Sequence, residues 1–178
     1  MKLRNAKGFT LIELLIVVAI IGIIAAIAVP GLLRARMSGN EASAIGSLRA
    51  INSGQASYSS SCAGGGYAVD LADLYLPPSG STQGFISPDL KTNAVAKSGY
   101  IVTLAADGNA GTQNIGTPSA TCNASTGQPV SSYFANADPI TPGGTGTRYF
   151  ATDTRGSIFQ DTTATIANPI PSSTAVVQ

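Results

Sequence analysis

A run of twenty residues without a charged side chain, residues 14–33, constrains this chain more than any other feature of its sequence. As an α-helix this run is about 30 Å long, which matches the hydrocarbon core of a bilayer. Basic residues precede it, and Arg34 and Arg36 follow it. One carboxylate, Glu13, stands directly at its start, although an acid weakens a membrane segment. The run predicts a membrane-spanning helix, and it predicts that Glu13 has a purpose apart from anchoring.

Two interpretations of this segment remain open from the residues alone. In the first, the segment is an ordinary secretory signal peptide, and the small-x-small triplet Ala26-Ile27-Ala28 is its cleavage site. Glu13 inside the apolar region counts against this interpretation, as does the helical pattern that continues past the triplet. In the second, the chain is cut between Gly8 and Phe9, and the apolar run stays on the mature protein.

The octapeptide Lys7-Gly8-Phe9-Thr10-Leu11-Ile12-Glu13-Leu14 resembles the prepilin signal shared by type IV pilins and type II secretion pseudopilins. The resemblance extends through Pro30 and at most to Tyr58. It implies that a membrane peptidase cuts after Gly8 and methylates Phe9. It further implies that the apolar helix first anchors the subunit in the inner membrane and later forms the core of a filament. Glu13 is then expected to pair with the Phe9 amine of a neighbouring subunit, because an unpaired buried charge is costly.

The apolar run predicts the first half of a helix that extends from about residue 9 to residue 58. Apolar residues at three- and four-residue spacing in the second half predict a stripe that packs on a globular head, with Glu41 and Ser47 on the exposed side. The stripe consists of Leu33, Met37, Ile45, Leu48, Ile51 and Tyr58. Pro30, followed by Gly31, removes a backbone donor and predicts a kink. With Gly22 it marks a segment that the resemblance implies can stretch on assembly.

The rest of the chain predicts a small head rich in loops. A short helix is expected near residues 69–76, and a Thr154-Arg155-Gly156 turn joins the last two predicted strands. The strands are predicted at residues 99–105, 131–137, 147–153 and 157–161. An antiparallel sheet formed by these strands would cover the helix stripe, whereas the tail after residue 162 is expected to end irregularly. The predicted fold is α+β, of the type IV pilin kind.

These expectations divide the chain into four parts. They are a cleaved leader (1–8), a transmembrane or filament-core half of the helix (9–33), an amphipathic half (34–58) and a loop-rich β head (59–178). Cys62 and Cys122 are the only cysteines, and in an exported chain they predict one disulfide, worth about 4 kcal/mol in the chain-entropy model. The aspartates are scattered and are expected to be solvated turn residues rather than a calcium site.

Composition excludes several classes of function. Histidine is absent, which rules out Ser-His-Asp and Cys-His catalysis and imidazole metal sites. No catalytic group, cofactor site or metal site is predicted. Loss of Lys2, Arg4 and Lys7 with the leader would leave seven basic and nine acidic side chains, so no specific binding of nucleic acid is expected. Without a nucleotide motif, the chain would depend on a partner ATPase for its movement.

The sequence therefore predicts a structural protein, the major pilin of a type IV pilus-like extracellular filament, and no enzyme. Expected partners are further copies of the chain in a helical polymer, the prepilin peptidase, an inner-membrane platform protein, the assembly ATPase and the membrane that the precursor spans once. The alternative is the major pseudopilin of a type II secretion system in the periplasm. An adhesive or DNA-binding minor pilin and an exported soluble protein are less favoured.

Overall fold

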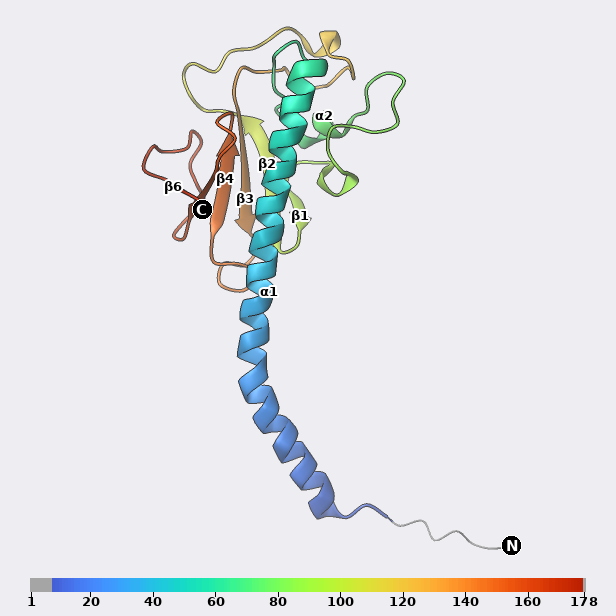
Figure 1. Ribbon diagram of the computed structural model, residues 1–178, viewed down its shortest axis with the longest axis vertical. Helices are drawn as coiled ribbons and strands as arrows, with labels where there is room; N and C mark the ends of the chain where they lie inside the picture. Colours follow the sequence, from blue (N-terminus) through green and yellow to red (C-terminus); the bar gives the residue numbers. More distant parts are fainter. Residues whose placement is uncertain (1–7, 178) are drawn as a thin grey trace, which may run out of the picture. The chain divides into compact units, whose positions relative to one another are not determined.

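The computed structural model describes residues 8–177 (Figure 1). The expected leader therefore lies outside the described residues except for Gly8. The chain divides into two compact units, Met1–Arg36 and Met37–Gln178. One long helix, α1 (Leu11–Ser61), contributes to both units. It begins two residues later and ends three residues later than the sequence predicts, a difference that is common at helix ends.

The head contains a six-stranded antiparallel sheet in which each strand pairs with the next along the chain, in the order β1-β2-β3-β4-β5-β6. Its strands are β1 (Val95–Lys97), β2 (Tyr100–Ala106), β3 (Tyr133–Pro139), β4 (Tyr149–Asp153), β5 (Ile158–Asp161) and β6 (Ala175–Val176). Short helices α2 (Leu71–Tyr75), η1 (Pro88–Leu90) and η2 (Pro118–Ala120) lie in the connections. The four predicted strands are confirmed to within two residues at each end, whereas β1 and β6 were not predicted.

The inner face of the sheet packs against the C-terminal half of α1, as Figure 1 shows. Tyr100, Val102 and Leu104 alternate along β2 and point into this core, as the two-residue period of a strand requires. From the helix, Leu48, Ile51 and Tyr58 are fully buried. The predicted amphipathic stripe is therefore confirmed at these three positions, but it does not extend to Leu33, which is 53% exposed.

The outer face of the sheet is also covered by the C-terminal tail, which is irregular over most of its length as predicted but ends in a short strand that was not predicted. Phe134 and Phe159 of the sheet form a second apolar cluster with Ile166 and Ile170. The segment after residue 162 thus returns across the sheet and then adds β6 next to β5. Pro169 and Pro171 suggested an irregular end, but isoleucines on the same segment had an apolar surface to cover.

An ion pair between buried Glu41 and partly exposed Arg148 joins α1 to the segment just before β4. Arg148 donates from Nε (2.9 Å) and Nη2 (2.8 Å) to Oε2 of Glu41, and the backbone and hydroxyl of Thr147 donate to Oε1. Burial of Glu41 favours its neutral form, but these hydrogen bonds and the guanidinium outweigh that effect and lower its pKa. The expectation that Glu41 and Ser47 face solvent was wrong, because both are buried against the head.

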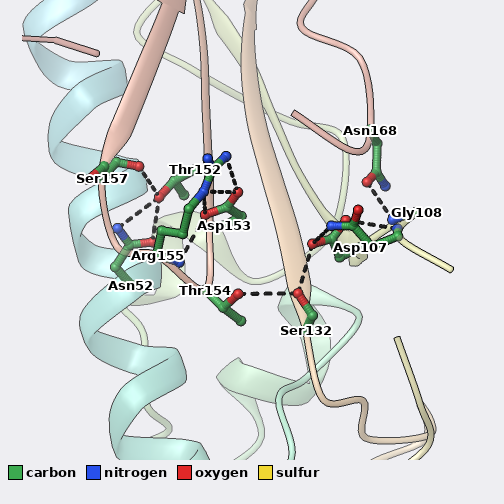
Figure 2. A network of polar contacts seen from close by, with 11 residues as sticks. Asn52, Asp107, Gly108, Ser132, Thr152, Asp153, Thr154, Arg155, Ser157 and Asn168 are labelled. Carbon is green, nitrogen blue, oxygen red and sulfur yellow. Dashed lines mark hydrogen bonds and ion pairs between the residues drawn. The ribbon is translucent and has the colours of Figure 1, made fainter. Parts of the chain in front are cut away.

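The β4–β5 hairpin is fastened to the helix by the polar network in Figure 2. Asn52 of α1 donates to Thr152 Oγ1 (2.9 Å) and to the carbonyl of Gly156 (3.0 Å). Thr152 in turn donates to the Ser157 carbonyl at 2.8 Å. The predicted turn is confirmed, with Gly156 at φ 73°, a left-handed conformation in which glycine carries no steric penalty.

Three aspartates expected to be solvated are buried instead. Asp153 is fixed by Arg155, whose Nη2 donates to it at 2.7 Å (Figure 2). Asp107 accepts from Asn109 and Ser132, and Asp73 accepts from the backbone of the loop at residues 126–127. Each carboxylate therefore organises a loop, which satisfies polar backbone groups that burial would otherwise leave unpaired.

Candidate functional site

The junction between Gly8 and Phe9 lies immediately before α1 and is open to solvent. Phe9 is 84% exposed, and a side chain added at Gly8 would meet no atom within 4 Å. The fold of the chain itself therefore does not require glycine at this position. A strict requirement for Gly8 would have to come from the enzyme that recognises the peptide, since small residues allow a close approach of the backbone.

Thr10 and Glu13 close the start of α1 by a reciprocal set of hydrogen bonds. The backbone and hydroxyl of Thr10 donate to Oε2 of Glu13 at 2.8 Å and 2.6 Å, and the Glu13 amide donates to Oγ1 of Thr10 at 3.3 Å. This arrangement is a capping box, in which two otherwise unpaired donors of the first turn are satisfied. Thr10 was not predicted as part of this site, although the Thr-x-x-Glu spacing is the recognised signal for such a cap.

The capping box leaves the second oxygen of Glu13 available. Within residues 8–177, both contacts to its carboxylate engage Oε2, and no hydrogen bond reaches Oε1. Glu13 thus has its position fixed by its own helix while it keeps one acceptor for a donor from outside the chain. Because the capping box already orders this side chain, Glu13 has less conformational entropy left to lose when it binds a partner.

The apolar half of α1 has no partner within the described residues. Every large apolar side chain between Phe9 and Leu33 is about half exposed or more. This is the one described helix long and apolar enough to cross a membrane, and its most apolar segment is not buried at all. Such a surface is stable only in lipid or against other apolar chains.

Pro30 and the two glycines near it lie inside this helix without ending it. Pro30 has no amide to donate to the preceding turn, which leaves one carbonyl of the helix without its usual partner. Gly22 and Gly31 have no neighbours that would exclude a side chain. Neither glycine is needed for close packing within the chain. The kink at Pro30 and the stretching of this segment on filament assembly therefore stay predictions.

The predicted disulfide is present and joins Cys62, directly after α1, to Cys122 in the loop before β3. The amide of Cys122 also donates to the carbonyl of Cys62 at 3.1 Å. Next to it, the side-chain amide of Asn123 donates to the carbonyls of Asp73 and Leu76. Asn123 is the first residue of an Asn-x-Ser glycosylation tripeptide, but its amide is occupied in holding this loop.

Comparison with known proteins finds its family-model match at the N-terminal end of the chain, around the Gly8–Phe9 junction. A model of the prokaryotic N-terminal methylation motif matches residues 3–29. The major component PilA4 of the type IV wide pilus of Thermus thermophilus is 67% identical over 39 residues, which are 22% of this chain and 30% of that protein. The type IV major pilin protein PilA of Myxococcus xanthus is 49% identical over 55 residues. These make up 31% of this chain and 24% of PilA, so the chain spans less than a third of either relative.

A third relative is matched over most of its length. The fimbrial protein EcpC of Eikenella corrodens is 37% identical over 115 residues, covering 58% of this chain and 75% of EcpC. No solved structure matched significantly. The methylation motif, the long apolar helix packed at its C-terminal half on an antiparallel sheet, and these similarities together show that the chain belongs to the type IV pilin family.

Proposed function

We propose that this chain is the major structural subunit of a type IV pilus-like filament on the bacterial surface. The observation that carries the proposal is the exposed apolar half of α1, which begins with a capped carboxylate directly after the Gly8–Phe9 junction. One surface of this kind serves two successive environments. It is soluble in the inner membrane before assembly, and it packs against identical helices afterwards.

The subunit is processed before it assembles. The prepilin peptidase cuts between Gly8 and Phe9, removes the basic leader and methylates the new amine of Phe9. The cut leaves a positive charge within one helical turn of Glu13 and at the N-terminal end of the helix dipole. This amine therefore appears where the subunit already holds a negative charge.

Assembly then uses that pair of charges. The Phe9 amine of an incoming subunit binds the free Oε1 of Glu13 on a neighbour, while Oε2 stays in the capping box. In a low-dielectric core an unpaired charge costs several kcal/mol, so subunits one register out of place are disfavoured. A platform protein and an assembly ATPase supply the work, and Pro30 with Gly22 and Gly31 allows the helix to bend or stretch as it leaves the membrane.

The second candidate is the major pseudopilin of a type II secretion system. A pilin is favoured because relatives with a matching N-terminus are named as major pilus components. The Asp-Pro-Trp-Gly sequence of calcium-binding pseudopilins is also absent. Asp138-Pro139, at the end of β3, continues into Ile140-Thr141 instead. Gene neighbours for outer-membrane secretion rather than retraction would favour the second candidate.

The experiment is N-terminal sequencing and intact mass measurement of protein from sheared surface filaments. The proposal expects the mature chain to begin with methylated Phe9 and to make up most of the filament mass. A chain that begins at Val29, after the Ala26-Ile27-Ala28 triplet, would contradict it and indicate an ordinary exported protein. Gly8→Ala is the matched variant: the fold tolerates it, so a loss of processing isolates recognition by the peptidase.

A further inference from the structure

Arg34 and Arg36 are the first charged residues after the apolar run, and both are exposed. The ion pairs within residues 8–177 involve Lys97, Arg148 and Arg155 and leave these two arginines out. Two guanidinium groups thus stand at the end of a membrane-length helix without a carboxylate partner in the described part of the chain. Their donors are therefore free to bind an anion at a membrane surface, and phosphate matches the planar guanidinium well.

The spacing of the two arginines indicates what kind of partner fits them. Residues two apart on a helix point about 200° away from each other around its axis. A neighbouring protein that approaches from one side therefore contacts one of these side chains and not the other. A layer of lipid headgroups surrounds the helix on all sides and reaches both.

The length of the helix places this layer at the correct depth. Residues 14–33 are about 30 Å long as a helix, so Arg34 and Arg36 lie at one boundary of the hydrocarbon core when Glu13 lies at the other. With both ends at an interface, neither the carboxylate nor the guanidinium groups must be buried at the bilayer centre. This placement removes the apparent cost of Glu13 in the membrane.

We propose that Arg34 and Arg36 bind the phosphates of anionic phospholipids in the outer leaflet of the inner membrane while the subunit awaits assembly. The proposal rests on the membrane stage of the proposed function and adds its lipid partner. The two arginines fix the depth of the helix in the bilayer.

The test uses the mature full-length chain in vesicles of phosphatidylcholine mixed with phosphatidylglycerol. Spin-labelled lipids report by electron paramagnetic resonance which headgroup associates with the helix. We expect the wild-type helix to prefer phosphatidylglycerol over phosphatidylcholine by about two- to fivefold, and we expect high salt to weaken this preference because ions screen exposed charges. Solid-state NMR gives a second measurement. When the guanidinium carbons of the arginines are labelled with ¹³C, nearby ³¹P nuclei of the lipids should dephase part of the ¹³C signal.

The variant R34Q/R36Q should lose both the lipid preference and the dephasing. R49Q is the matched control, because Arg49 is an exposed arginine on the same helix within the head. A preference that persists in R34Q/R36Q, one that is absent from the wild-type chain, or one that R49Q abolishes equally would overturn the proposal. Protease protection separates this failure from that of the proposed function: a helix that does not span the vesicle membrane contradicts both, whereas a spanning helix without selectivity contradicts the lipid proposal alone.

Discussion

The two halves of α1 have the same backbone conformation but opposite relations to their surroundings. Between Leu11 and Leu33 the apolar side chains are exposed, and the only side-chain hydrogen bonds of that half among the described residues are those of the Thr10–Glu13 cap. From Glu41 onward the helix buries a stripe against the sheet and makes polar contacts with the head. The head completes its own core, whereas the N-terminal half requires lipid or other copies. Assembly and stability should therefore respond to different mutations.

The largest effect on filament assembly is expected from Glu13→Val in the apolar half. Without the carboxylate, the Phe9 amine of each incoming subunit stays unpaired in the filament core at a cost of roughly 3 kcal/mol or more, which reduces assembly at least 100-fold. Surface filaments can be counted by electron microscopy and pilin by immunoblot of the sheared fraction. The thermal unfolding of the head should not change.

Glu13→Gln separates the charge from the helix cap. Glutamine at this position can keep the hydrogen bonds to Thr10 through its single oxygen, but it loses the negative charge and carries an NH2 group in place of the free oxygen. The account expects this variant to assemble as poorly as Glu13→Val. Filaments at wild-type abundance would show that Glu13 acts through the cap alone.

The next effect belongs to the head. Replacement of Cys62 and Cys122 by serine opens a loop with a sequence separation of 60 residues. In the chain-entropy model this lowers the free energy of unfolding by about 4 kcal/mol. Urea unfolding of the detergent-solubilised chain, followed by circular dichroism, measures the loss. A change below ~1 kcal/mol would mean that the packing around Tyr58 holds this corner without the bridge.

Glu41→Ala tests the ion pair that joins the helix to the head. It leaves Arg148, which is one-third exposed, without its main partner, and we expect a loss of about 2–3 kcal/mol. Because the folded-state pKa of Glu41 is lowered, its stabilisation is present above the unfolded value of 4.5 and is lost as pH falls through the folded value. The difference between wild type and variant should therefore shrink below pH 4.5.

The smallest effect is expected at Asp138. Burial raises the pKa of its carboxyl group, and hydrogen bonds from Thr165 and Asn136 only partly counter this effect. Its Oδ1 is buried and has no hydrogen-bond partner among residues 8–177. A raised pKa means that stability from this group is lost as pH rises through the folded value. Asp138→Asn should stabilise the head at pH 7 by roughly 1 kcal/mol or less, and by nothing at pH 3. Equal unfolding midpoints at pH 7 would contradict this.

The sequence predicted the apolar half of α1 better than the head, for physical reasons. Uncharged length, the spacing of apolar residues and turn residues are local signals, so the helix and four strands could be located from the pattern alone. The contact between Glu41 and Arg148 could not, because the residues are 107 positions apart and a buried glutamate looks like a surface one in a helical pattern. The packing of the C-terminal tail over Phe134 and the strands β1 and β6 could not be predicted either, because they too depend on tertiary contacts.

Density for filaments sheared from the cell surface tests the central claim most directly. A cryo-EM reconstruction should show a chain that begins at Phe9, apolar halves of α1 packed against one another in the core, and Glu13 in contact with the Phe9 amine of a neighbour. The heads should retain the sheet order β1 to β6 and lie outside this core. Filaments whose core excludes residues 14–33, or in which Glu13 faces solvent away from every Phe9 amine, would contradict the account.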